Sequence, residues 1–191
     1  MKIISLIASG TEIVHSLGNA KDLVGISHEC DYPISIKSLP ICSEPRFDSD
    51  GRSIEVDTQI KSLLQSALSV YRVREDVISK LSPDIIITQS QCDVCAVNIK
   101  DVRSALDSIL GIQPEIISLE PTNLNDVWCD IKDVANILNK DNEAMTMLNG
   151  FNEDIRIIKE KNRQHKPISI GCIEWIEPLM FAGNWVPEIV N

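Results

Sequence analysis

The stretch Ser82-Pro83-Asp84-Ile85-Ile86-Ile87-Thr88 joins a turn to four β-branched residues in a row. The serine, proline and aspartate are typical of a turn that ends the preceding segment. A continuous β-branched run is typical of a strand that is buried on both faces of a parallel sheet. This part of the chain therefore predicts one central strand of an α/β sheet.

Strand and helix patterns alternate on both sides of this strand. Strand-like runs occupy residues 2–7, 23–26 and 115–119. Helical patterns occupy residues 9–17, 55–68, 74–81 and 98–110. The repeated order of strand, loop and helix predicts an open parallel α/β lobe over residues 1–122. Ligands of such sheets lie at the carboxyl ends of the strands.

Two polar loops directly follow predicted strands, so we expect them to share this edge. The first, residues 27–33, holds His28, Glu29 and Asp31, and the second opens at Gln89. A neutral imidazole such as that of His28 can coordinate a metal or donate a hydrogen bond to a ligand. The alternative is a plain turn capped by Asp31. The candidate ligand-binding residues on these loops and on the first helix are Ser9, His28, Glu29, Asp31, Gln91 and Asp93.

The second loop carries Cys92 and Cys95 as a lone Cys-x-x-Cys pair. Three interpretations are open: a zinc site completed by Cys30, His28 or Asp93, a thiol redox pair, or small residues that fill a tight loop. The six cysteines are spread along 191 residues, unlike a small disulfide scaffold, so we expect reduced thiols.

The pattern changes after residue 122. Residues 123–166 contain no strand-like run, and their apolar residues recur at helical spacing, which predicts one long connecting helix or a nearly continuous pair. A strand is expected from Ile168 to Ile173. The loop after it holds Trp175, Gly183, Asn184 and Trp185, and aromatic residues held by turns suit a loop that contacts a ligand. Residues 167–191 thus read as the start of a second, truncated α/β lobe.

Composition narrows the classes of function. The net charge of −10 argues against nucleic acid as a partner, because phosphate binding requires concentrated Lys and Arg. No apolar run approaches the roughly 20 residues that span a bilayer, and the N-terminus does not have the pattern of a signal peptide. There is no nucleophile elbow, phosphate-binding glycine loop or His-Glu-x-x-His helix, so we do not expect an enzyme.

Several segments resemble the helical-backbone periplasmic substrate-binding proteins of ABC transporters, in particular their cobalamin-binding subgroup. The resemblance covers nearly the whole chain in order. It is carried by the segments SLIASGTEIV (5–14), VGISHECDYP (24–33), LSVYRV (68–73), SPDIIITQ (82–89), QCDVCAV (91–97), EWIEP (174–178) and AGNWVPE (182–188).

The resemblance implies two α/β lobes joined by a long helix, with a corrinoid such as cobalamin held in the cleft between them. The expected partners are that ligand, which is transported and is not a cofactor, and an ABC permease that docks near Asp101. The family also implies a monomer located outside the cytoplasmic membrane.

Other ligands and roles stay open. Cobalamin-binding relatives grip the corrin with aromatic residues where this chain has Glu29 and Gln89. Another corrinoid, a haem-like ring or a metal chelate is therefore an alternative ligand. The rival functions are a metal-binding protein that uses Cys30, Cys92, Cys95 and His28, and a cytoplasmic corrinoid carrier.

Overall fold

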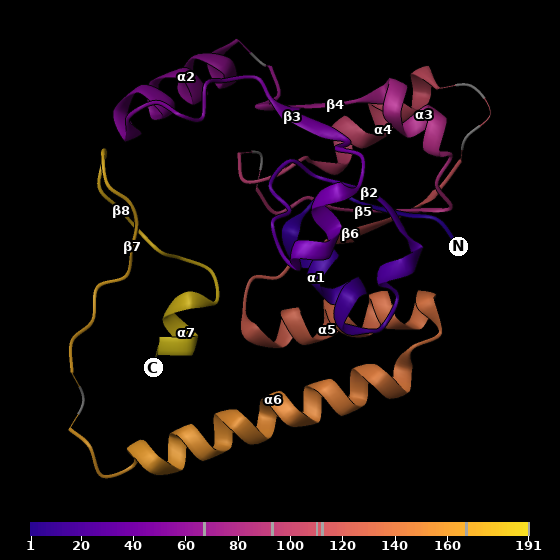
Figure 1. Ribbon diagram of the computed structural model, residues 1–191. Coiled ribbons are helices and arrows are strands. Elements are labelled where there is room, and N and C mark those ends of the chain that lie inside the picture. The colour runs from indigo at the N-terminus through magenta and orange to yellow at the C-terminus, as the bar shows by residue number, and fades with distance from the viewer. Residues whose placement is uncertain (67, 93, 110, 112, 167, 191) are drawn as a thin grey trace. The chain divides into compact units, whose positions relative to one another are not determined.

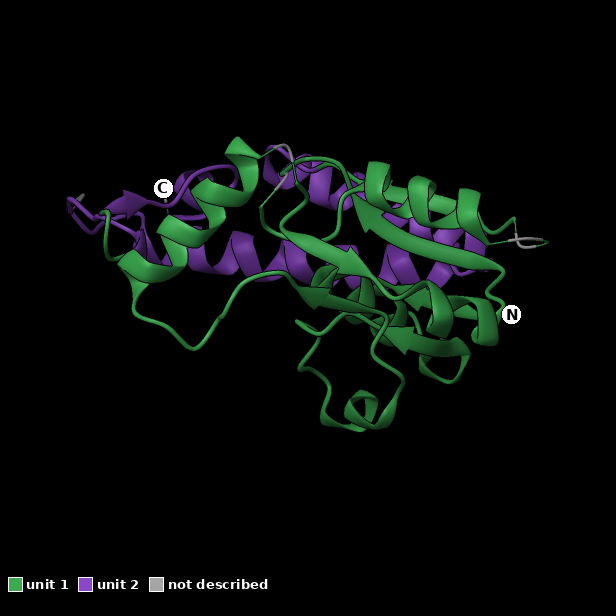
Figure 2. Ribbon diagram, turned by 90° about the horizontal axis from the view of Figure 1, so that it is seen from above, with its two compact units in different colours: residues 1–120, 176–178 green, residues 121–175, 179–191 purple. Residues whose placement is uncertain are grey.

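The computed structural model describes residues 1–66, 68–92, 94–109, 111, 113–166 and 168–190 (Figure 1). The chain divides into two compact units, shown in separate colours in Figure 2. The first unit comprises residues 1–120 and 176–178, and the second comprises residues 121–175 and 179–191.

The first unit contains the predicted parallel sheet. Its four strands lie in the order β2 (Leu23–Ile26), β1 (Ile3–Ser5), β5 (Ile85–Gln89) and β6 (Glu115–Leu119), and every neighbouring pair is parallel. All five residues of β5 are buried, as expected for a β-branched strand with neighbours on both sides. The prediction of an α/β fold with a parallel sheet is confirmed.

The helices of this unit follow the predicted patterns closely. They are α1 (Ala8–Ser16), α2 (Ser53–Gln65), α3 (Glu75–Leu81) and α4 (Ile99–Ser108), with short 3-10 helices at Ala20–Asp22 and Ile34–Ser38. The Asn98 side chain caps α4 by accepting a hydrogen bond from the Lys100 backbone N–H at 2.9 Å. Capping fixes where this helix begins, directly after the loop that follows β5.

A second, small sheet was not predicted. It pairs β3 (Ser43–Pro45) with β4 (Tyr71–Val73) in antiparallel fashion. Strands of three residues are too short to show a period of two in the sequence. This sheet matters for the site because β3 supplies Ser43 and β4 supplies Tyr71.

The second unit contains a pair of helices where one long helix was the first expectation. They are α5 (Leu124–Leu138) and α6 (Asp141–Asn162). Asn139 adopts a left-handed conformation with φ 56° and ends α5, so this segment forms the alternative that was also predicted, a pair of helices separated by two residues, and not a single helix over residues 123–166. The Trp128 ring stacks on Phe151 with centroids 5.6 Å apart, so the two helices fold back on each other (Figure 1).

The strand predicted from Ile168 to Ile173 is also wrong for most of its length. Residues 168–172 have no regular structure, and the Ile168 side chain is 78% exposed. β7 (Ile173–Trp175) pairs with β8 (Met180–Phe181), and a short helix α7 (Val186–Val190) follows. An apolar run forms a strand only where a neighbour supplies hydrogen bonds, and β8 reaches only as far as Ile173.

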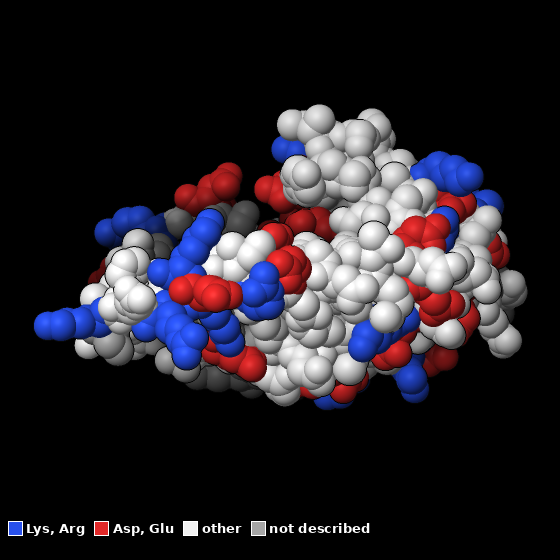
Figure 3. All heavy atoms as spheres, turned by 90° about the horizontal axis from the view of Figure 1, so that it is seen from below, with Lys and Arg blue, Asp and Glu red and all other residues white. Residues whose placement is uncertain are grey.

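Charged residues on the described helices are mixed in sign. On α6, Arg156 pairs with Glu153 at 2.8 Å and with Glu160 at 3.0 Å. Figure 3 shows acidic and basic side chains side by side over the face that it draws. None of the described helices combines the length with the apolar composition that crossing a bilayer requires.

Two glycines give a matched prediction about packing. A Cβ at Gly25 in β2 would lie 2.5 Å from Cys42 Sγ and 2.9 Å from Leu81 Cδ1, whereas a Cβ at Gly150 in α6 would meet nothing within 4 Å. We expect Gly25→Ala to lower the free energy of unfolding by about 1–3 kcal/mol through overpacking. Gly150→Ala is expected to raise it by about 0.5–1 kcal/mol, because alanine favours the helix. Urea denaturation measures both, and equal effects would contradict the packing described for Gly25.

Candidate functional site

The parallel sheet brings the predicted loops to one edge. β2 and β5 are the two neighbours of β1, so the loop after β2 and the loop after β5 lie at the carboxyl end of β1, where α1 begins. Ser9 is exposed in the first turn of α1. We call this edge, with the residues that follow β1, β2 and β5, the carboxyl edge.

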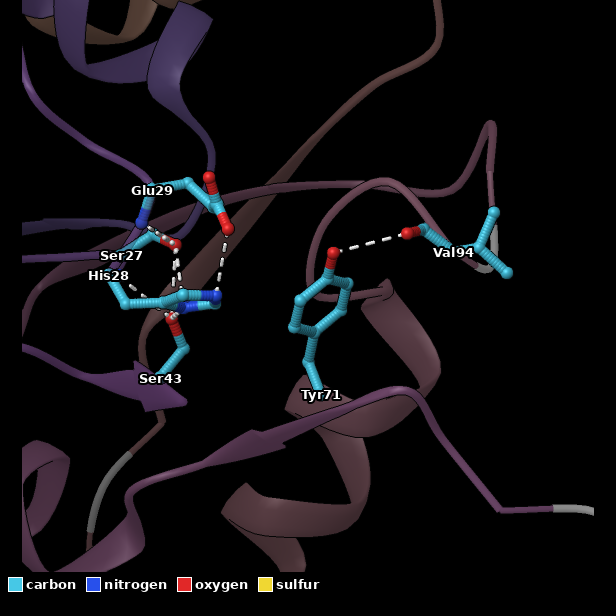
Figure 4. Close-up of polar contacts among 6 residues, drawn as sticks. All are labelled: Ser27, His28, Glu29, Ser43, Tyr71 and Val94. Carbon is cyan, nitrogen blue, oxygen red and sulfur yellow. Dashed lines mark hydrogen bonds and ion pairs between the residues drawn. The ribbon is translucent and has the colours of Figure 1, made fainter. Parts of the chain in front are cut away.

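His28 is the centre of a polar cluster at this edge (Figure 4). Its Nδ1 lies 2.9 Å from the Ser43 hydroxyl, and its backbone N–H donates to the same hydroxyl at 3.3 Å. The hydroxyls of Ser43 and Ser27 are 3.0 Å apart, and the Glu29 backbone N–H donates to Ser27 at 3.3 Å. The imidazole is therefore held in place from its Nδ1 side by β3.

The other ring nitrogen of His28 faces a carboxylate. Nε2 lies 3.1 Å from Glu29 Oε1, and the Glu29 side chain is 54% exposed. The contact lacks the alignment of a hydrogen bond, and Nε2 is shielded from water without a hydrogen-bond partner among the described residues. Burial lowers the pKa of His28, while the neighbouring carboxylates of Glu29 and Glu44 oppose this shift. The lowered pKa favours a neutral imidazole near neutral pH, which can accept or donate a hydrogen bond.

The lowered pKa of His28 predicts how stability depends on pH. Since the folded-state pKa lies below the ordinary value of 6.5, the unfolded chain binds the proton first as the pH falls. The stability linked to this group is complete above 6.5 and is lost as the pH falls through the folded-state pKa. We therefore expect acidification to destabilise the native chain more than a His28→Gln variant in urea titrations. Parallel curves for the two proteins would contradict this expectation.

The second loop is organised by Gln89, which is 3% exposed. Its Nε2 donates to the carbonyls of Cys92 at 2.6 Å and Ala96 at 3.2 Å, and its Oε1 accepts from the Cys92 backbone N–H at 2.8 Å. Gln89 thus shapes the loop. The candidate Gln91 has a buried amide nitrogen without a hydrogen-bond partner among the described residues. Asp93, also a candidate, lies outside the described residues.

Three residues of this cluster were missed from the sequence: Ser27, Ser43 and Tyr71. The Tyr71 ring lies 5.3 Å from the His28 ring, and its hydroxyl donates to the Val94 carbonyl at 3.1 Å. Tyr71 therefore connects β4 with both polar loops. No local signal reveals this, because Ser43 and Tyr71 are far from His28 in sequence and lie on the unpredicted small sheet.

The cluster has the order of a Ser-His-acid triad, from Ser43 through His28 to Glu29. The Ser43 side chain is fully buried at 0% exposure, so its hydroxyl cannot reach a substrate. What the arrangement offers is a fixed imidazole beside an exposed carboxylate. Such groups suit recognition of polar atoms on a bound molecule.

The cysteines differ from the expectation of reduced thiols. Cys92 and Cys95 form a disulfide, with Cα atoms 5.6 Å apart. Cys30 is buried, and its Sγ lies 3.0 Å from the Thr11 hydroxyl. Among the described residues, no group of three or more His, Cys, Asp and Glu side chains could hold a metal ion. The described geometry thus gives no support to the alternative metal site of Cys30, Cys92, Cys95 and His28.

The remaining candidates are spread over both units. Asp31 is exposed on the loop after β2. Asp101 lies in the first turn of α4, where it accepts a hydrogen bond from the Ser69 hydroxyl at 2.6 Å, and its role in docking stays a prediction.

The aromatic loop belongs to the second unit. Trp175 ends β7, and Gly183, Asn184 and Trp185 form the turn between β8 and α7, with Asn184 at a positive φ of 54°. Both tryptophans are partly buried. Their contact with a ligand stays a prediction.

Comparisons with known proteins find the same fold. The chain matches the vitamin B12-binding protein of Vibrio cholerae (TM-score 0.67, 18% identity, 99% of this chain and 63% of that one). It matches equally a possible iron-binding periplasmic solute-binding protein of Staphylococcus epidermidis (TM-score 0.67, 18% identity, 99% and 64%). A periplasmic haem-binding protein of Vibrio cholerae is a third match (TM-score 0.63, 16% identity, 91% and 54%).

Other comparisons add no match. No family model matches the sequence, and no curated protein matches it. The chain spans less than two thirds of the length of these structural neighbours. At these identities the likeness concerns the fold, which this chain shares with periplasmic binding proteins for vitamin B12, iron or haem.

Proposed function

We propose that this protein binds a corrinoid, such as cobalamin, outside the cytoplasmic membrane and delivers it to an ABC transporter. The observation that carries the proposal is a pair of buried side-chain nitrogens at the carboxyl edge, His28 Nε2 and Gln91 Nε2, for which the described residues supply no hydrogen-bond partner. A buried polar atom without a partner costs free energy, and a ligand that supplies the missing hydrogen bond recovers it.

The chemistry of the edge fits the rim of a corrinoid. Corrin side chains end in amides, which both donate and accept hydrogen bonds. The Glu29 carboxylate and the Gln91 amide supply an acceptor and a donor, and Ser9 and Asp31 are exposed on the segments that follow β1 and β2.

A haem is the second candidate, and His28 is the observation that favours it. A neutral imidazole is a good ligand for ring-bound iron, provided that the exposed Glu29 side chain moves away from Nε2. Binding through His28 would shift the Soret band of haemin, and His28→Ala would abolish that shift. The corrinoid proposal requires no such bond to the metal.

Isothermal titration of the protein with cyanocobalamin and, separately, with haemin tests the proposal. We expect saturable heat and a raised melting temperature with cyanocobalamin. Saturable binding of haemin alone would assign the haem alternative. The absence of heat and of thermal protection with both compounds would overturn the proposed function.

A further inference from the structure

The disulfide on the carboxyl edge includes one exposed cysteine. It joins Cys92 and Cys95 in the loop after β5, and Cys95 is exposed whereas Cys92 is partly buried. Thiolates break a disulfide by attacking one of its sulfur atoms, so access to that sulfur governs the rate. The exposed position of Cys95 therefore admits a small thiol.

The other cysteines of the first unit are protected. Cys30 and Cys42 are buried, and burial raises the pKa of both thiols, that of Cys42 to about 12. A thiol that stays protonated and shielded is inert. Cys129 and Cys172 lie in the second unit, where Cys129 is exposed. In the described first unit, thiol chemistry is thus confined to the Cys92–Cys95 pair.

The disulfide is connected to His28 through two contacts. Val94 lies between the two cysteines in the sequence and so belongs to the loop that the disulfide closes. Its carbonyl accepts a hydrogen bond from the Tyr71 hydroxyl at 3.1 Å. Tyr71 is 6% exposed, and its ring lies 5.3 Å from the His28 ring (Figure 4). The buried Tyr71 side chain is therefore the contact through which a movement of Val94 would reach the imidazole.

Gln89 limits what opening the disulfide can change. It hydrogen-bonds Cys92 and Ala96 from one buried side chain, so both ends of this segment stay attached to β5 when the disulfide opens. Val94 lies between these two ends, and we expect its hydrogen bond with Tyr71 to change when the disulfide opens.

We propose that Cys92–Cys95 is a thiol–disulfide exchange site whose oxidation state controls the ligand affinity of the carboxyl edge. The control of affinity rests on the proposed function, whereas the exchange itself does not. The co-reactant is a low-molecular-weight thiol.

The exchange reaction takes place in two steps. In the first step, the thiolate of the low-molecular-weight thiol attacks Cys95 Sγ and forms a mixed disulfide with it. The bond between Cys95 and Cys92 breaks, and Cys92 leaves as a thiolate that takes a proton from water. A second thiol attacks the mixed disulfide, which releases Cys95 as a thiol and the reagent as its own disulfide. Two electrons and two protons pass to the protein.

A thiol count tests the exchange site. In a Cys129→Ser/Cys172→Ser background, we expect no thiol of the folded, oxidised protein to react with a chromogenic disulfide reagent. After treatment with dithiothreitol and desalting under argon, we expect two reactive thiols and an unchanged circular dichroism spectrum. Failure to gain two thiols, or their gain only on unfolding, would overturn the exchange site.

The coupling to the ligand site has its own readout. In the Cys92→Ser/Cys95→Ser variant we expect shifted NMR signals for the Tyr71 and His28 rings and about fivefold weaker binding of cyanocobalamin, as for one lost hydrogen bond. The matched control, Cys129→Ser/Cys172→Ser, should leave both unchanged. Unchanged ring signals and affinity in the first variant would overturn the coupling.

The two proposals fail in distinguishable ways. If neither cyanocobalamin nor haemin binds the oxidised protein, the proposed function and the control of affinity fall together. The thiol count and the ring signals still decide whether the exchange site exists and whether it is coupled to His28.

Discussion

Replacing Ile86 with alanine is expected to lower the free energy of unfolding by about 2–5 kcal/mol, the usual cost of emptying a buried isoleucine site. Ile86 is fully buried in the middle of β5, with Ile4 of β1 and Ile116 of β6 as its register partners. Close packing on both sides leaves little room for the sheet to collapse around the cavity. Urea denaturation, with a check that the m-value is unchanged, measures the loss.

The control for this experiment is the same substitution at an exposed isoleucine. Ile158 on α6 is 57% exposed, so Ile158→Ala should change the free energy of unfolding by no more than about 0.5 kcal/mol. If both substitutions cost the same, β5 is not the buried centre of the sheet, and the position of the carboxyl edge would need revision.

The double variant His28→Ala/Gln91→Ala is expected to weaken binding of cyanocobalamin by roughly 10- to 100-fold, since two hydrogen bonds to the ligand are lost. Each residue has a buried nitrogen without a hydrogen-bond partner among the described residues. Fluorescence or calorimetric titration measures the affinity. His28→Ala also removes the contacts of the ring with Ser43 and Tyr71, so urea denaturation must show that the variant is still folded under the conditions of the titration.

Asn19 provides a matched control for the ligand-binding variant. Its Oδ1 is the third buried, unpartnered side-chain atom among the described residues, but Asn19 precedes the amino end of β2, whereas His28 follows the carboxyl end. Asn19→Ala should leave the affinity unchanged. Equal losses in the control and the double variant would show that general destabilisation, and not the carboxyl edge, is responsible.

The sheet could be predicted from the sequence because its signals are local. The β-branched run 85–88 reports burial on both faces, and residues 23–26 form a strand with the predicted bounds. The edge shared by the loops of His28 and Gln91 followed from the rule that parallel strands end together. These inferences required no knowledge of contacts between distant residues.

The rest depends on contacts between residues that are distant in sequence, or on single backbone conformations. Ser43 and Tyr71 reach His28 from strands of three residues, which leave no periodic pattern. A left-handed Asn139 divides the predicted long helix, although asparagine is common inside helices as well. The Cys92–Cys95 disulfide depends on the fold of a loop that Gln89 shapes. Sequence spacing alone left metal, redox and packing roles open for that pair.

The most direct test of the carboxyl edge as a binding site is NMR mapping of the 15N-labelled protein during addition of cyanocobalamin. We expect the largest shifts at the His28 ring and the Gln91 side-chain amide, with smaller shifts at Ser9 and Asp31 and none at Asn19. Saturable shifts that avoid the loops after β1, β2 and β5, or no shifts at millimolar ligand, would contradict the account.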